Sequence, residues 1–205
     1  GGGADIEASF VSTRARSNRI SRPRMEAPRT DRRLQALAIA ALIGLVAAIY
    51  APVRNHAFVA FDSATYITGN EHVASGLSWD NVRWAWTTFH AANWHPLTWI
   101  SHMLDVQFLG ERPGLHLLVN VLFHAANAIL VYLVLRSATA RAGASFVVAL
   151  LFAAHPLHVE SVAWIVERKD VLSTFFGLLA LATWVRYART GRRGAYVGAL
   201  LLFAA

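Results

Sequence analysis

The residues best suited to chemistry are concentrated between His155 and Ser173, in the stretch HPLHVESVAWIVERKDVLS. Its ionisable side chains are His155, His158, Glu160, Glu167, Arg168, Lys169 and Asp170. Apolar runs flank this stretch on both sides, and ionisable groups near membrane depth mark a functional cavity by default. We therefore interpret the stretch as one half of a site. An isolated carboxylate, Asp62, is a candidate general base for the other half.

The first part of this stretch, His155-x-x-His158-x-Glu160, resembles a metal-ligand pattern. Two histidines three residues apart share one face of a helix, and a carboxylate could complete a zinc site. The pattern lacks the His-Glu-x-x-His spacing of zinc hydrolases. It favours a hydrogen-bonded polar network at a lipid or sugar site, with a purely structural role and a metal site as alternatives. We predict no cofactor and assign no metal ligands.

The second part of the stretch pairs two basic residues, Arg168 and Lys169, with acidic neighbours. A phosphate at the membrane interface can be bound by the planar fork of an arginine and the point charge of a lysine. The alternative is that both side chains extend to the interface and pair with Glu167 and Asp170. On a continuous helix, Arg168 would share one face with Glu160 and Trp164.

The elements that must position these residues are membrane helices. The chain has 205 residues, of which 56% are hydrophobic and only 15% charged, and the apolar residues form long runs. This predicts an all-α, polytopic membrane bundle with helices at about 34–52, 115–135, 145–166 (broken at Pro156), 171–188 and 195–205. The absence of cysteine excludes disulfides and thiolate metal sites.

Between the first two predicted helices, residues 53–114 mix aromatic residues with turn signals. This composition is typical of the membrane–water interface, and we expect interfacial helices at about 78–90 and 95–109 with Ser78 as an N-cap. The next predicted helix carries a polar stripe on one face. Its members are His116, Asn120, His124 and Asn127. Interhelical hydrogen bonds and a direct substrate role are the two interpretations of this stripe.

The charge distribution predicts the topology. The net charge is +7, but no nucleic-acid-binding motif is visible, and the arginines cluster beside the apolar runs as the positive-inside rule expects. Residues 1–33 are predicted to be a disordered, basic, cytoplasmic tail, with Met25 a candidate start of the protein. The long 53–114 loop and the His155 stretch then share the outer face. We expect the chain to be an N-terminal fragment of a longer protein.

Four stretches give the sequence a resemblance to a known family. They are FVAFDSATYI (58–67), WAWTTFHAANWHPLTWISH (84–102), LHLLVNVLF (115–123) and LFAAHPLHVESVAWIVERKDVLS (151–173). They resemble the bacterial relatives of the transmembrane-and-tetratricopeptide-repeat O-mannosyltransferases, within the GT-C glycosyltransferases. The resemblance covers residues 34–205. It implies a multi-pass protein, in the inner membrane of a bacterium, with helical repeats beyond the present fragment.

The resemblance also implies a reaction. Such enzymes transfer a sugar, here mannose, from a polyprenyl- or dolichyl-phosphate donor to a protein Ser/Thr hydroxyl on the non-cytoplasmic face, inverting the anomeric centre. Asp62 would be the catalytic base, and Arg168 and Lys169 would bind the donor phosphate. A second set would form a polar network around the site: His95, His155, His158, Glu160 and Asp170.

Two other functions remain open from the sequence. Intramembrane histidines and carboxylates also occur in ion- or proton-coupled transporters, although there they lie at several depths. A catalytically inactive scaffold of the same fold is the other alternative. Ser63 gives it some support, because the family commonly has a second acidic residue directly after the base. The expected partners are therefore a lipid-linked sugar, a protein acceptor and the bilayer, and no nucleic acid.

Overall fold

The computed structural model describes residues 29–57 and 63–205. All regular structure in these ranges is helical, which confirms the predicted all-α membrane bundle. Among the described residues, three segments are long and apolar enough to cross a bilayer: Asp31–Asn55, Pro113–Thr139 and Ile165–Thr190. Asp62 lies outside the described residues, as do residues 1–28 of the predicted tail.

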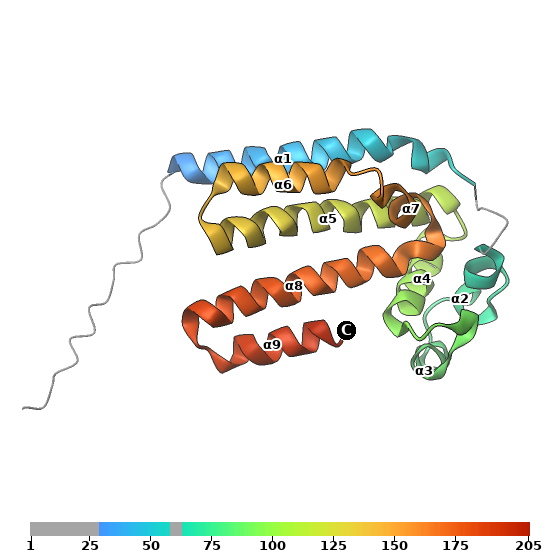
Figure 1. The fold of residues 1–205 in the computed structure, drawn as a ribbon. Coiled ribbons are helices and arrows are strands. Elements are labelled where there is room, and N and C mark those ends of the chain that lie inside the picture. The colour runs from blue at the N-terminus through green and yellow to red at the C-terminus, as the bar shows by residue number, and fades with distance from the viewer. Residues whose placement is uncertain (1–28, 58–62) are drawn as a thin grey trace, which may run out of the picture.

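Five helices form the body of the bundle (Figure 1). They are α1 (Arg29–Tyr50), α5 (Pro113–Thr139), α6 (Ala142–Ala154), α8 (Arg168–Thr190) and α9 (Arg193–Phe203). Helix α5 lies between the α1–α6 pair and α8, and α9 runs beside α8. Helix α1 begins at Arg29 rather than at Leu34, so part of the predicted tail is helical. The side chain of Arg136 near the end of α5 bonds Asp31 and Gln35 of α1.

The shorter elements gather at one end of this bundle (Figure 1). They are the 3-10 turn η1 (Ala51–Asn55), the π turn η2 (Ala64–Thr68), α2 (Glu71–Ala74), α3 (Trp79–Thr87), the 3-10 turn η3 (His90–Ala92), α4 (Pro96–Leu109), α7 (His158–Ala163) and the 3-10 turn η4 (Ile165–Glu167). Ser78 caps α3, as predicted, by accepting a hydrogen bond from the Asn81 N–H. The long loop and the His155 stretch therefore lie at the same end.

Two breaks shape the His155 stretch. Helix α6 ends before Pro156, which cannot continue a helix, and α7 starts at His158. Trp164 is extended, with φ −116° and ψ 124°, so α7 ends at Ala163. Arg168 then begins a separate helix, α8. The expectation that Glu160, Trp164 and Arg168 share one helical face is therefore wrong.

The polar stripe of α5 makes hydrogen bonds to main-chain carbonyls, three of them in the α6–α8 region around these breaks and one at the end of α4. The side chain of Asn120 donates to the Trp164 carbonyl (3.2 Å) and that of Asn127 to the Val171 carbonyl (2.9 Å). His124 Nε2 donates to the Ala153 carbonyl (3.1 Å) and His116 Nε2 to the Gly110 carbonyl (2.8 Å). All four side chains are buried. These contacts favour the packing interpretation, because a helix interrupted within a membrane needs partners for its freed carbonyls.

Helix α5 also packs tightly on η1, where the long loop begins. An added Cβ on Gly114 would lie 2.0 Å from the Arg54 carbonyl oxygen in η1. Only glycine therefore fits at position 114 in the first turn of α5, because the backbone of η1 comes so close to it. This contact anchors η1, and with it the start of the long loop, to the central helix.

Candidate functional site

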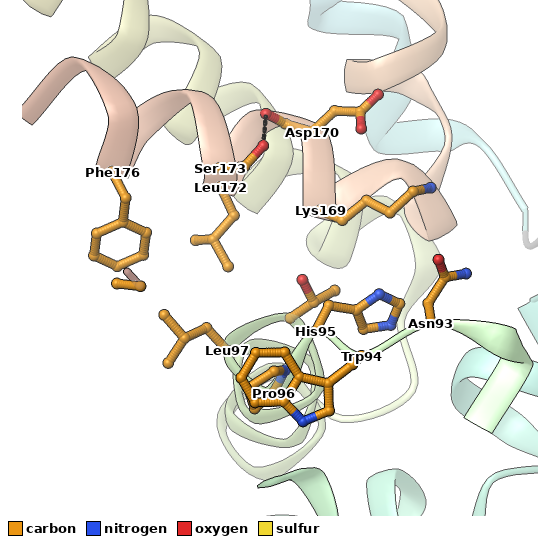
Figure 2. A pocket seen from close by; sticks show the side chains of 12 residues that line it. Asn93, Trp94, His95, Pro96, Leu97, Lys169, Asp170, Leu172, Ser173 and Phe176 are labelled. Atoms are coloured by element: carbon orange, nitrogen blue, oxygen red, sulfur yellow. Dashed lines mark hydrogen bonds between the residues drawn. The ribbon is translucent and has the colours of Figure 1, made fainter. Parts of the chain in front are cut away.

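The main candidate site is a cavity of about 360 Å³ where the start of α4 faces the start of α8 (Figure 2). It is lined by Asn93, Trp94, His95, Pro96, Leu97, Thr98, Lys169, Asp170, Leu172, Ser173, Phe176 and Ala205. Three residues that the sequence assigned to the site, His95, Lys169 and Asp170, line this cavity although more than 70 positions separate the first from the others. The cavity thus joins the long loop to the His155 stretch.

The two ends of the cavity differ in polarity. Figure 2 shows His95, Lys169 and Asn93 toward one end, and Leu97, Leu172 and Phe176 toward the other. A molecule that fits this distribution has a polar or charged head and an apolar tail. The Asp170 carboxylate points away from His95 and accepts a hydrogen bond from the Ser161 hydroxyl (2.9 Å).

His95 is held in the wall of the cavity by aromatic neighbours. Its ring centroid lies 4.7 Å from that of Trp99 and 5.9 Å from that of Tyr66. Burial, together with the positive charge of Lys169, lowers the pKa of His95 to about 4. The imidazole is therefore neutral at pH 7. Its Nε2 atom is buried and makes no hydrogen bond with any described residue.

The lowered pKa of His95 predicts a loss of stability in mild acid. Between its usual pKa near 6.5 and the folded value near 4, the unfolded chain binds more protons than the folded chain. Stability therefore falls as the pH drops from about 6.5 to about 4. Replacing His95 by Asn should reduce this dependence, as measured by the melting temperature in detergent across that pH range.

The matched control for this measurement is His56→Asn, because His56 is exposed and lies in the same segment between α1 and α5. That variant should retain the acid dependence of the wild type. Some dependence should also persist in His95→Asn, since burial and the charge of Arg168 lower the pKa of His102 well below its usual range. If the melting temperature of His95→Asn depended on pH as that of the wild type does, His95 would not be a source of the acid dependence.

Lys169 and Arg168 are neighbours in sequence but have different surroundings. Lys169 lines the cavity, its side chain is 32% exposed, and its amine pairs with the Glu167 carboxylate at 2.6 Å. The ammonium has three donor hydrogens, so it can bind a further acceptor while it keeps this pair. Arg168 is fully buried behind the cavity.

The guanidinium of Arg168 is surrounded by protein acceptors. It donates to the Asn120 side-chain oxygen (2.5 Å), the Ser101 hydroxyl (2.8 Å) and the His116 carbonyl (2.7 Å). It also pairs with the Asp105 carboxylate at 2.6 Å. These contacts connect α8 to both α4 and α5. Every nitrogen of the guanidinium is engaged, which leaves Lys169 as the residue of this pair that faces the cavity.

The remaining predicted network residues lie elsewhere around α7. His158 lines a second, small cavity of about 30 Å³ that also touches Asp170, and its ring lies 5.3 Å from that of His124. His155 is exposed, and its Nδ1 accepts a hydrogen bond from the Leu157 N–H. Glu160 is exposed and lines neither cavity. The structure therefore places His95, Lys169 and Asp170 along one cavity, with the Asp170 carboxylate turned toward Ser161, and leaves His155 and Glu160 at the surface.

Sequence reasoning missed a buried cluster behind the cavity, formed by His102 and Asp105 of α4 and His116 of α5. Their potential ligand atoms lie within 4.8 Å of one another, a spacing that could hold a metal ion. The guanidinium of Arg168 already compensates the Asp105 carboxylate, so a divalent cation would add uncompensated positive charge to a buried site. The His102-x-x-Asp105 spacing on a predicted helix was the available signal.

Comparison with known proteins identifies relatives. Over 103 residues the chain is 37% identical to protein O-mannosyl-transferase TMTC1 of Mus musculus, covering 50% of the chain and 11% of the relative. It is 30% identical to human protein O-mannosyl-transferase TMTC2 over 137 residues, 63% of the chain and 16% of the relative. A Drosophila melanogaster protein O-mannosyl-transferase, Tmtc1, is 29% identical over 188 residues, 88% of the chain and 22% of the relative.

The chain is similar to protein O-mannosyl-transferases. This similarity supports the relationship to the TMTC proteins that the sequence motifs implied. The matched region spans only 10% to 22% of the length of these curated relatives. No family model matches the chain, and no solved structure matches it.

Proposed function

We propose that the chain is part of a membrane glycosyltransferase. The enzyme transfers a sugar, mannose in our proposal, from a polyprenyl- or dolichyl-phosphate donor to a Ser/Thr hydroxyl of a protein on the non-cytoplasmic face. The observation that carries this proposal is the cavity between α4 and α8, which has His95 and Lys169 at one end and apolar side chains at the other. The names of the relatives support the same class of reaction.

The proposed reaction is a direct displacement with inversion. The acceptor hydroxyl transfers its proton to the Asp62 carboxylate as its oxygen forms a bond to the anomeric carbon. The bond between that carbon and the phosphate oxygen breaks, and the lipid phosphate leaves. The phosphate changes from a diester with one negative charge to a monoester with two. Positive charge at the phosphate therefore binds the transition state more tightly than the donor.

In this proposal the residues of the cavity have different roles in the reaction. Lys169 supplies the positive charge, because its amine lies at the cavity wall with donor hydrogens to spare. The neutral imidazole of His95 can donate a hydrogen bond to a phosphate oxygen. The apolar end, with Leu172 and Phe176, receives the first part of the lipid chain. Arg168 acts indirectly, since its contacts fix the start of α8 and thus the direction of Lys169.

Replacing Lys169 by Gln tests this proposal. We expect kcat/KM for the lipid-phosphate sugar to fall by about 10²-fold, the scale of losing one donor to developing negative charge. Lys169→Arg should retain much of the activity because it keeps the charge. The measurement is transfer of labelled mannose from dolichyl-phosphate mannose to an acceptor peptide by the full-length protein in detergent.

The matched control is Arg112→Gln, which removes a positive charge at the same end of the bundle but does not line the cavity. Its kcat/KM should equal that of the wild type. Equal kcat/KM for Lys169→Gln and the wild type would place the donor phosphate elsewhere.

A further inference from the structure

Helices α8 and α9 form a hairpin whose turn lies at the opposite end of α8 from Lys169 (Figure 1). A third cavity, lined by arginines, lies in this hairpin. The hairpin carries four arginines: Arg186, Arg189, Arg192 and Arg193. The chain contains no acidic residue after Asp170. Within the described ranges, none of the four guanidinium groups makes an ion pair or a side-chain hydrogen bond. This cluster therefore has no acidic partner among the described residues.

Only two of these arginines line the cavity, which has a volume of about 370 Å³. Its lining residues are Thr183, Arg186, Arg192, Gly194, Ala195 and Gly198. The space results from the small residues of α9, and an added Cβ at Gly194 or Gly198 would have no neighbour within 4 Å. Arg186 and Arg192 thus approach the cavity from opposite sides of the hairpin turn, at Gly191.

Aromatic residues of the same hairpin indicate the depth of this cavity. Trp184, Tyr187 and Tyr196 form a cluster with ring centroids 5.3 to 6.2 Å apart, and Trp184 and Tyr196 are 48% and 40% exposed. Tryptophan and tyrosine concentrate at the headgroup level of a bilayer. Arg186 is 17 residues after Lys169 on one helix, which corresponds to about 25 Å at helical rise. The two cavities therefore lie at opposite ends of a helix that is long and apolar enough to cross a membrane.

We propose that this cavity binds the headgroup phosphate of an anionic phospholipid. The forked guanidinium groups of Arg186 and Arg192 match the geometry of a phosphate, and the small-residue wall of α9 leaves room for the glycerol part of the lipid. Basic pockets between membrane helices bind such headgroups in general. The site is independent of the donor cavity and of the proposed transfer reaction.

The alternative is that the arginines only orient the hairpin in the membrane, as the positive-inside rule describes. The chain offers a matched comparison that separates these explanations. Arg189 and Arg193 belong to the same hairpin and carry the same charge, but they do not line the cavity. A bound lipid depends on Arg186 and Arg192 alone, whereas orientation by charge depends equally on all four.

The test measures lipid binding to the purified full-length protein by native mass spectrometry, with phosphatidylglycerol and phosphatidylcholine as the probes. The wild type should retain phosphatidylglycerol in preference to phosphatidylcholine. The double variant Arg186→Gln/Arg192→Gln should bind it about tenfold more weakly, whereas Arg189→Gln/Arg193→Gln should bind it as the wild type does. Gly198→Leu fills the cavity without changing the charge, and it should also lose the lipid.

Three results would overturn the proposal. The first is equal loss of phosphatidylglycerol from both double variants, which would mean that total charge alone attracts the lipid. The second is equal retention of the two lipids by the wild type. The third is that inorganic phosphate at millimolar concentration displaces phosphatidylglycerol completely, which would identify a site for a free anion.

Discussion

Replacing Asp62 by Asn is expected to lower kcat for mannose transfer by about 10²- to 10⁴-fold, the scale of losing a general base. The amide is nearly the same size as the carboxylate, but it cannot accept the proton of the acceptor hydroxyl. The KM for the lipid donor should change little, since Asp62 acts on the acceptor in the proposed reaction. Transfer of labelled mannose from dolichyl-phosphate mannose to a peptide by the full-length protein provides the measurement.

The described residues that follow Asp62 support this role. Ser63 is buried, and the Tyr66 ring packs against those of His95 and Trp99, at centroid distances of 5.9 Å and 4.9 Å. The segment after the proposed base is therefore anchored beside the cavity that would hold the donor. A displacement reaction needs this arrangement, because the acceptor oxygen and the sugar must meet within about 3–3.5 Å.

Two control variants make the Asp62 result specific. Asp80→Asn removes a carboxylate from the first turn of α3, where it is exposed, and should leave kcat unchanged. Ser63→Ala changes the buried residue directly after the proposed base, and it should also remain active. Unchanged turnover in Asp62→Asn would exclude this carboxylate as the base. Full activity of Asp62→Asn with inactive His95→Asn would shift the role of the base to His95.

The features that the sequence predicts well depend on local patterns. Long apolar runs determine which segments can span a membrane, and the spacing of His116, Asn120, His124 and Asn127 places these side chains on one face. The Ser78 cap is equally local, because donor and acceptor are three residues apart. Each of these predictions needs only the geometry of a single helix.

The features that the sequence does not predict depend on contacts between distant residues. Arg168 and Lys169 are adjacent basic residues at the start of a helix, and nothing local distinguishes the buried side chain from the one at the cavity. The partners of Arg168 decide this, and they lie 48 to 67 positions earlier in the chain. Trp164, whose carbonyl accepts a hydrogen bond from the distant Asn120, is likewise extended and separates α7 from α8, and Glu160 is exposed.

Replacing Arg168 by Met is expected to destabilise the protein by about 3–5 kcal/mol, the usual effect of removing one partner of a buried ion pair. The Asp105 carboxylate would be left as an uncompensated charge in a buried environment, and the Asn120 oxygen and the His116 carbonyl would lose their donor. Thermal unfolding in detergent, followed by tryptophan fluorescence, measures the loss.

Two further variants identify the source of this effect. Arg168→Met/Asp105→Leu removes both charges, so it should regain part of the lost stability, although the Asn120 oxygen and the His116 carbonyl remain without a donor. Lys169→Gln should unfold close to the wild-type temperature, because the pair between Lys169 and Glu167 is partly exposed. If Arg168→Met were instead as stable as the wild type and lost donor binding as Lys169→Gln does, Arg168 would be a phosphate ligand. The four acceptors around its guanidinium argue for the opposite outcome, in which Arg168 holds α4, α5 and α8 together and Lys169 is the one of these two basic residues that contacts the donor.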